Sequence, residues 1–400
     1  MKNITTNRIS LFSLLFFLSL KLAQAQDLPY KFTEDIQSKI NSSENTFALQ
    51  LAATDFAFQG SYSKALKTWN EQRPDLKEIK LTPFDSVFFH NSKAVSAKDY
   101  IIDRSKNEKI VILNELHHNA SHRWFATSLL KDLYANGYRY LGLEALDDLL
   151  INERQFATVE SGFYTSEPNF GNFIKEALDL GFTVFGYEAS DKDNWDKDPW
   201  KNREIAQAKN IHTFMKNNTN GKYFIYCGAG HAFEGDNNGR GMSMAGILAE
   251  LTGTNPFTID QNKYSDKGES RYNQPLSKLI TTTTPTVLIN DKGIIFRGNP
   301  SSYETDISII QPANSFLGTT LLLQKSKAYK KIILPKNLIK TYPAMILLYR
   351  KGEAEQNGVP TAVYEVLTDT DIPSIFLKKT TYEIIILDKN YQIQNKYTSD

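Results

Sequence analysis

Ile110-Val111-Ile112-Leu113 is an uninterrupted apolar run, and Asn114-Glu115-Leu116-His117-His118 follows it directly. Four apolar residues bounded by polar ones are typical of a strand that is buried on both faces of a sheet. The next segment repeats Phe125, Leu129 and Leu133 at helical spacing, and Asn136-Gly137 ends it. We therefore predict a buried strand, a polar loop and then a helix, with Asn119 or Ser121 as the helix cap.

The same order recurs along the chain. β-prone runs at 138–143, 182–187, 223–227 and 257–259 alternate with helical runs at 173–180, 205–215 and 244–251. Gly137, Gly181 and Gly221 each precede a predicted strand, where a left-handed glycine would close the preceding helix. This alternation predicts an α/β fold, with a mostly parallel sheet and helices on both faces.

The pattern changes on either side of this region. We predict a helical N-terminal lead-in at residues 26–97 and the α/β domain at residues 98–317. From residue 276 helical periodicity fades, and turns such as Asn290-Asp291-Lys292-Gly293 and Asp388-Lys389-Asn390 separate β-branched and aromatic runs. Because such turns are typical of hairpins, we predict a small β-rich C-terminal appendage at residues 318–400.

The first 25 residues have the layout of a cleaved signal peptide. They contain Lys2 and Arg8, an apolar run at 11–20, and Ala23-Gln24-Ala25 at the end. The apolar run is too short to span a bilayer, and no later stretch is long enough. We therefore expect an exported protein, periplasmic or extracellular, with no integral membrane segment after signal removal.

Composition excludes several classes of protein. Removing Lys2, Arg8 and Lys21 from the 46 basic residues leaves 43 against 45 acidic ones, so the charge gives no case for nucleic acid as a partner. Cys227 is the only cysteine, so no intrachain disulfide can form. No Gly-x-Ser-x-Gly motif is present, and no dinucleotide or Walker-type glycine loop follows a predicted strand.

Polar side chains follow the predicted strands at one end. In strand order they are Glu115, His117 and His118, then Glu144, then Glu188, then His231. Because the carboxyl ends of neighbouring parallel strands meet at one crevice, we expect these side chains to converge. Each also has a structural alternative. Glu115 could form a buried salt bridge with Arg123 or Arg203, and only one of the two adjacent histidines needs to face the crevice.

Imidazole and carboxylate groups allow two kinds of chemistry. They are ligands for zinc, manganese, cobalt or non-haem iron, and they also supply a general base with its orienting partner. The residues alone leave both open. The candidate metal ligands are Glu115, His117, Glu144 and His231. The candidate catalytic residues are Glu115, His118, Glu144 and His231. The candidate substrate-binding residues are His122, Arg123, Glu188 and Arg203.

Three segments resemble the Tiki, ChaN and erythromycin-esterase superfamily. They are 112–123 with its Glu-x-His motif, Leu141-Gly142-Leu143-Glu144, and Gly228-Ala229-Gly230-His231. The resemblance covers residues 98–262. It is greatest for the ChaN-like haem-binding branch, whose motif continues with further histidines at the places of His118 and His122. The motif of this superfamily has the form Gly-Glu-x-His. Two residues of the chain depart from it: Asn114 replaces the glycine, and Arg123 stands where a second histidine often follows.

The branches of this superfamily imply different functions. Tiki proteases are metal-dependent, and their spacing favours His117, whereas erythromycin esterases use no metal, and their spacing selects His118. The leading hypothesis is an exported hydrolase of a small-molecule or peptide substrate, in which Glu115, His117, Glu144 and His231 bind a divalent metal and its water, and His118 or His122 assists proton transfer. One alternative is haem or iron-compound binding without catalysis. The other is a metal-free esterase with His118 as general base and Glu144 orienting it.

Overall fold

The computed structural model describes residues 28–43, 46–190, 198–236, 239, 241–298, 304–312 and 327–399. The predicted signal peptide at 1–25 and the predicted boundary at 317/318 lie outside the described residues. None of the described helices is both long and apolar enough to cross a membrane.

In the described residues, eight strands form one main sheet in the order β1-β7-β8-β6-β2-β5-β3-β4. They are β1 (Ser92–Ser96), β2 (Ile110–Glu115), β3 (Tyr138–Leu143), β4 (Thr183–Gly186), β5 (Lys222–Gly228), β6 (Phe257–Tyr264), β7 (Thr286–Asn290) and β8 (Ile307–Ile310). From β8 to β4 all neighbours run parallel, whereas β7 runs antiparallel to both β1 and β8. The predicted α/β class with a mostly parallel sheet is confirmed.

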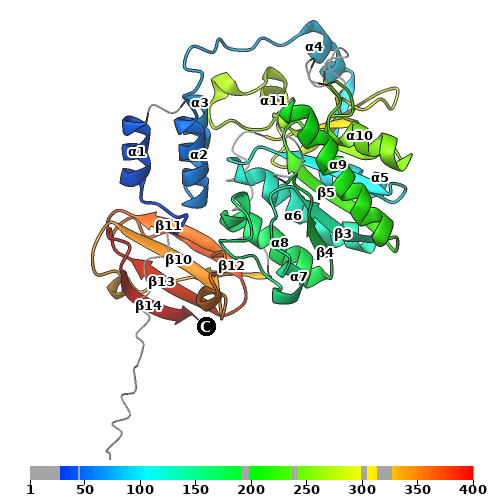
Figure 1. Cartoon of the computed structure of the whole chain (residues 1–400). Coiled ribbons are helices and arrows are strands. Elements are labelled where there is room, and N and C mark those ends of the chain that lie inside the picture. Colours follow the sequence, from blue (N-terminus) through cyan, green and yellow to red (C-terminus); the bar gives the residue numbers. More distant parts are fainter. Residues whose placement is uncertain are drawn as a thin grey trace, which may run out of the picture.

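Helices cover both faces of this sheet (Figure 1). One face carries α5 (Ala97–Ser105), α6 (Ala120–Ala135) and α8 (Pro168–Leu180), and the other carries α9 (Pro199–Asn217) and α10 (Met244–Thr252). Short helices α4 (Pro83–His90), α7 (Ile151–Arg154) and α11 (Pro275–Leu279) lie in the connections.

The sequence of β2 explains its central place in the sheet. Val111 and Leu113 belong to the core beneath α6 and α8, whereas Ile110 and Ile112 belong to the core beneath α9 and α10. Apolar side chains on both faces of a strand are removed from water only if helices cover both faces of the sheet. The last residue of β2, Glu115, is therefore carried into the interior as well, with 1% of its surface exposed.

Two small antiparallel sheets follow the main sheet. β10 (Ala344–Arg350), β11 (Ala362–Val366), β13 (Tyr382–Leu387) and β14 (Ile393–Ser399) form one, and β9 (Tyr329–Ile332) pairs with β12 (Ile375–Lys378) in the other. Figure 1 shows them in orange and red beside the α/β layers. The predicted β-rich C-terminal region is confirmed in residues 327–399.

The N-terminal helices join the C-terminal sheet to the α/β layers. They are α1 (Thr33–Ser42), α2 (Ala48–Phe58) and α3 (Tyr62–Asn70), blue in Figure 1. Tyr30, Phe32 and Phe58 pack in one apolar cluster with residues of β10, β11 and β13. At the other end, Asn70 donates a hydrogen bond to the carbonyl of Lys267 in the loop after β6, at 2.8 Å.

Most element types between residues 98 and 262 agree with the predictions, and β3 has the predicted bounds. Gly137 and Gly181 adopt φ values of 91° and 94°, as predicted for residues that close a helix. The prediction was wrong for Gly221, which does not have a positive φ, because α9 is already capped at Asn218. The sheet also includes β1, β7 and β8, which no sequence pattern had assigned to it.

Candidate functional site

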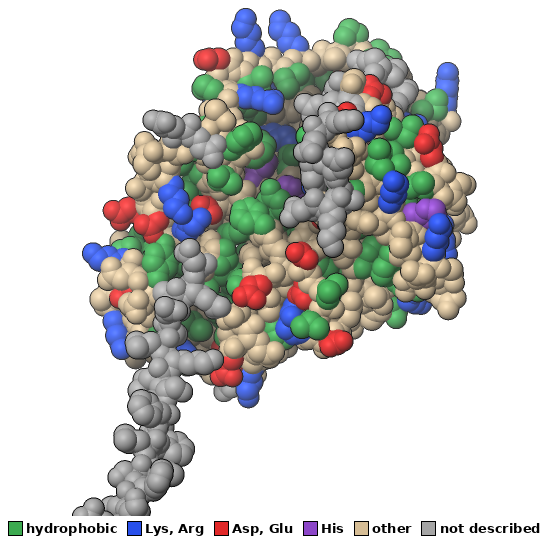
Figure 2. Space-filling model, viewed as in Figure 1, with side chains coloured by type: hydrophobic (Ala, Val, Ile, Leu, Met, Phe, Trp, Pro, Cys, Tyr) green, Lys and Arg blue, Asp and Glu red, His purple; other side chains and the backbone are tan. Residues whose placement is uncertain are grey.

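The polar residues that follow the strands do converge. Glu115 at the end of β2 lies opposite Gly228 at the end of β5. Leu143, which precedes Glu144, lies between Tyr226 of β5 and Gly186 of β4. Figure 2 shows histidine side chains recessed in a hollow on one face of the molecule, bordered by hydrophobic side chains.

Glu115 is held on both carboxylate oxygens. Arg123 donates from Nε to Oε2 at 2.8 Å and from Nη2 to Oε1 at 2.7 Å, and the Tyr226 hydroxyl donates to Oε2 at 2.7 Å. His117 Nδ1 lies 2.7 Å from Oε1. Burial alone would raise the pKa of Glu115, but Arg123 and His117 bring it well below its ordinary value. Glu115 is therefore a charged carboxylate with no free oxygen.

Arg123 also contacts Glu167, which no sequence pattern had suggested. Its Nη1 donates to Glu167 Oε2 at 2.9 Å, and its guanidinium lies over the Phe170 ring at 4.7 Å. Glu167 accepts the backbone N–H of Phe170 as the cap of α8. The sequence signal that could have identified Glu167 is its position directly before Pro168, because proline favours the first position of a helix. The two carboxylates together compensate one fully buried guanidinium.

His117 faces the crevice. With its Nδ1 against Glu115, its ring stacks on Tyr164 with centroids 3.7 Å apart, and 26% of its side chain is exposed. A Cβ built on Gly228 would lie 3.1 Å from His117 Nε2 and 3.2 Å from Glu144 Oε2. His117 Nε2 and the Glu144 carboxylate therefore flank the same glycine, which leaves room for both because it has no side chain.

Glu144 is bound on both oxygens too. It accepts the backbone N–H of Gly228 on Oε2 and Arg203 Nη2 on Oε1 at 2.5 Å, and His231 Nε2 lies 3.4 Å from Oε1. Burial would raise its pKa, but His231, His117 and Arg203 bring it below its ordinary value. Glu144 is the carboxylate on which both imidazoles and one guanidinium converge.

His231 is oriented by a second buried carboxylate. Its Nδ1 lies 2.7 Å from Glu204 Oε1, its Nε2 lies 3.1 Å from Arg203 Nη1, and its ring stacks on Trp200. Burial opposes the charged form, but Glu144 and Glu204 raise the pKa of His231 to about 10. Glu204 was not among the predicted residues. Its helical spacing from Ala208 and Ile211, both in the core, is the signal that placed it on the buried face of α9.

Arg203 links Glu144, which follows β3, to Glu188, which follows β4. Its Nε donates to Glu188 Oε1 at 3.0 Å, and its Nη2 contacts both Glu188 and Glu144. Two carboxylates raise the pKa of this guanidinium above its ordinary value although burial lowers it. Glu188 and Arg203, both predicted as substrate-binding residues, therefore form one ion-pair network at the mouth of the crevice.

His118 and His122 lie on the other side of their loop. The His118 ring is 2% exposed and stacks on Trp69 of α3, with centroids 3.9 Å apart. His122 Nδ1 accepts the backbone N–H of Leu116 at 2.9 Å, which fixes the turn of the loop. Burial and the nearby Lys267 lower the pKa of both histidines, that of His122 to about 3, so both rings are neutral.

The donor set does not fit a metal ion as it is arranged. Across the described residues, no group of three or more His, Cys, Asp or Glu side chains is placed to hold one. The reason lies in the two arginines. Arg123 binds both carboxylate oxygens of Glu115. Arg203 lies against Glu144 Oε1 and His231 Nε2, in the place that a bound metal ion would need.

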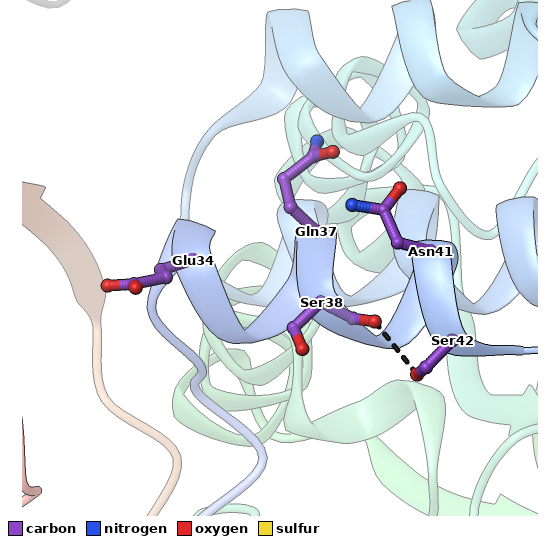
Figure 3. Close-up of a pocket in the computed structure, with 5 residues that line it drawn as sticks. All are labelled: Glu34, Gln37, Ser38, Asn41 and Ser42. Carbon is purple, nitrogen blue, oxygen red and sulfur yellow. Dashed lines mark hydrogen bonds between the residues drawn. The ribbon is translucent and has the colours of Figure 1, made fainter.

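Two further hollows lie elsewhere. One runs along α1 and is lined by Glu34, Gln37, Ser38, Asn41 and Ser42 (Figure 3). Figure 3 shows these side chains on one helix, with the Ser42 hydroxyl hydrogen-bonded to the Ser38 carbonyl. The other lies between α3 and residues 269–272. The first contains no imidazole and no paired charges, and we assign it no chemistry.

Comparisons with known proteins do not assign a family. No family model matches the chain, and no curated protein matches it significantly. Among solved structures it is similar to the type III effector HopBA1, with 13% identity and a TM-score of 0.35 over 56% of this chain and 98% of that one. ChaN of Campylobacter jejuni, described with cofacial haem binding, has 10% identity and a TM-score of 0.34 over 55% and 94%.

A third structure is RRSP, a MARTX toxin effector domain from Vibrio vulnificus, with 13% identity and a TM-score of 0.32 over 64% of this chain and 49% of that one. Scores at this level indicate a distant likeness and carry no argument about function. The class that the fold and the site define is an α/β protein with a crevice of Glu, His and Arg residues at the carboxyl end of its parallel strands. The resemblance to one superfamily stays a prediction.

Proposed function

We propose that the chain is a hydrolase that activates water with one imidazole oriented by a buried carboxylate, and that it needs no metal ion. One observation carries the proposal. His117 is backed by Glu115 at Nδ1 and its Nε2 lies beside Glu144 next to Gly228, whereas His231, whose pKa Glu144 and Glu204 raise to about 10, is a cation beside the same carboxylate. An imidazole whose Nδ1–H is held by a carboxylate presents a basic Nε2 to its surroundings.

In the proposed reaction, His117 Nε2 takes a proton from a water molecule while the water oxygen attacks the carbonyl carbon of an ester. The carbonyl electron pair moves onto its oxygen, and the cations of Arg203 and His231 stabilise that negative charge. When the tetrahedral intermediate collapses, the bond to the leaving oxygen breaks. The proton held by His117 then passes to the leaving alkoxide, so that an acid and an alcohol are released.

This proposal uses His117 as the base, where the spacing of erythromycin esterases selects His118. His117 is partly exposed beside Glu144, whereas His118 is enclosed against Trp69. The metal-dependent hypothesis, with Glu115, His117, Glu144 and His231 as ligands, would require Arg123 and Arg203 to leave their carboxylates. Since each guanidinium makes several charge-assisted hydrogen bonds, that rearrangement is costly.

Haem or iron-compound binding is the competing proposal, and it rests on the sequence resemblance. Its support in the structure is the stacked, partly exposed His117 ring, which is the type of group that binds a haem iron. Export to the periplasm or the medium is likewise proposed from residues 1–25 alone. Mass spectrometry of protein secreted by the native cell would test it, with a new N-terminus at Gln26 as the expected result.

The test of the hydrolase proposal is a panel of chromogenic esters with the purified full-length protein. His117→Gln and Glu115→Gln should lower kcat by about 10²-fold to 10⁴-fold, the usual contribution of a general base. His90→Gln, a change of an exposed histidine on α4, is the matched control and should leave kcat unchanged. Dialysis against a chelator should also leave it unchanged.

Two outcomes would reject the proposal. One is hydrolysis that His117→Gln leaves intact. The other is a rate that disappears with the chelator and returns with zinc, manganese, cobalt or iron, which would restore the metal hypothesis. A haem titration on the same protein separates the third possibility, because a saturable Soret band that His117→Gln abolishes, without ester hydrolysis, would indicate a haem-binding protein.

A further inference from the structure

The loop after β6 contains a lysine that the proposed chemistry does not use. Lys267 Nζ donates to the carbonyl of Asn262 at 2.6 Å and to the Ser265 hydroxyl at 2.7 Å. Within the described ranges the carboxylates nearest to it, Asp260 and Asp266, act on its charge without an ion pair. Lys267 is held from both sides, because its carbonyl accepts Asn70 of α3 and the neighbouring Asp266 carbonyl accepts Asn119 of the 116–122 loop.

The groups around Lys267 compensate its charge only in part. On the 116–122 loop and the start of α6, His118 and His122 are neutral because burial and the Lys267 ammonium lower their pKa values. The acidic groups on its own side are engaged elsewhere. Asp260 accepts Asn114 Nδ2 and the backbone N–H of Asn262, and Asp266 accepts the backbone N–H of Gly268. Asp260 and Asp266 favour the charged form of Lys267 without forming an ion pair with it, and burial outweighs them and lowers its pKa to about 8. An enclosed ammonium that is only partly compensated gains from a ligand that supplies a negative charge.

Asn262 provides an independent observation. Its side chain is 8% exposed, and neither Oδ1 nor Nδ2 has a hydrogen-bond partner in the part of the chain that the structure describes. Its main-chain carbonyl holds the Lys267 ammonium, so the unpartnered amide lies on the same turn as the unpaired cation. Most buried side-chain amides in proteins are hydrogen-bonded, and an amide that is not calls for a missing partner.

We infer that Lys267 and Asn262 form an anion-binding subsite beside the crevice, which receives a carboxylate or phosphate group of the substrate. The ammonium supplies the charge, and the Asn262 NH₂ group supplies a directed donor. As a substrate subsite the inference rests on the proposed hydrolase function, since it assigns that function an anionic substrate. Anion binding itself does not depend on hydrolysis, which makes the two separable.

Isothermal titration calorimetry of the full-length protein at pH 7 tests the subsite, with inorganic phosphate and succinate as separate probes. At least one probe should bind saturably, and whichever binds more tightly identifies the group. Lys267→Met should weaken that binding tenfold or more, Asn262→Ala should weaken it by a smaller factor, and Lys267→Arg should restore part of it. Lys39→Met, a change of an exposed lysine on α1, is the matched control.

The outcomes are decisive in both directions. Binding that His117→Gln leaves intact, while ester hydrolysis is lost, would support the subsite and the base separately. The inference fails if neither probe binds, or if Lys267→Met binds as the unmodified protein does. It also fails if binding survives in Lys267→Met and disappears in Arg203→Met, because the anion would then be in the crevice itself. If Lys267→Met does not fold, Lys267→Arg and Asn262→Ala decide.

Discussion

Arg123 donates from Nε and Nη2 to both oxygens of Glu115, at 2.8 and 2.7 Å, and neither side chain is more than 1% exposed. The contact arises because β2 ends at Glu115 and α6 begins at Ala120, so the first turn of the helix returns to the end of the strand. A two-point contact of this kind fixes the orientation of the carboxylate as well as its charge. Since His117 Nδ1 rests on the same carboxylate, Arg123 also orients the proposed base.

The buried Glu115–Arg123–Glu167 cluster predicts a large effect of Arg123→Met on stability. Removing the guanidinium leaves two carboxylates without a counter-charge in the interior, which costs about 3–5 kcal/mol for a broken buried pair. Urea denaturation followed by circular dichroism measures the loss. Lys98→Met, which removes an exposed partner of Asp132, is the control and should change the unfolding free energy by less than about 1 kcal/mol. A change of that small size in Arg123→Met would contradict the cluster.

The close packing around Gly228 predicts that the substitution Gly228→Ala lowers the catalytic rate more than it lowers stability. In Gly228→Ala, the new methyl group would lie 3.1 Å from His117 Nε2 and 3.2 Å from Glu144 Oε2, so both side-chain ends must move. We expect kcat for ester hydrolysis to fall by about 10-fold, because His117 Nε2 and Glu144 Oε2 must each move by a few tenths of an ångström, and a general base acts only within a narrow range of positions. Gly235→Ala, where a Cβ meets nothing within 4 Å, should leave kcat unchanged. Equal rates in the two variants would contradict the placement of the base.

The pairing of His231 with Glu204 predicts a pKa that nuclear magnetic resonance can measure. In the folded protein Glu144 and Glu204 raise the pKa of His231 to about 10. Glu204→Gln removes one of these charges, so the pKa of His231 should fall, while Glu160→Gln in an exposed loop should not change it. A resonance of His231 that titrates at the same pH in both variants would show that Glu204 does not orient this ring.

His122 predicts how stability depends on pH. Its pKa is lowered to about 3 in the folded chain and is about 6.5 when unfolded. Between these values the unfolded chain binds the proton and the folded chain does not, so the unfolding free energy should fall as the pH decreases from 6.5. The expected slope is at most about 1.4 kcal/mol per pH unit for this one group.

The measurement for His122 is urea denaturation between pH 4.8 and 6.5, a range chosen to lie above the ordinary titration of carboxylates. His122→Gln should have a shallower slope than the unmodified protein, whereas His90→Gln should retain the full slope. His118, whose pKa is also lowered, contributes with the same sign in all three proteins. An unchanged slope in His122→Gln would mean that this imidazole titrates normally in the folded chain.

The framework of the site could be predicted from sequence because it depends on local patterns. The apolar run before Glu115 identifies β2, and the recurring strands place Glu144, Glu188 and His231 at the same end of a parallel sheet. That convergence follows from strand direction alone. The salt bridge between Glu115 and Arg123 was also among the alternatives, since a buried carboxylate needs a partner.

The partners from distant segments could not be predicted in the same way. Glu167, Tyr164 and Trp69 come from segments whose local patterns do not indicate which part of the crevice they reach. The two adjacent histidines point in different directions, His117 toward Glu144 and His118 toward α3, in a loop where Leu116 N–H donates to His122 Nδ1 and Arg123 Nη2 donates to the His117 carbonyl. Such contacts depend on the folded loop rather than on residue type.

The anchoring of the N-terminal helices has a consequence for how the protein is made. Tyr30, Phe32 and Phe58 leave the ribosome early, but the strands that cover them, in residues 344–387, are synthesised last. The helix that brings Trp69 to His118 follows directly from these early segments. The apolar cluster that anchors these helices is therefore complete only when synthesis is nearly finished, and a nascent chain that stops before residue 344 would lack the strands on which it packs.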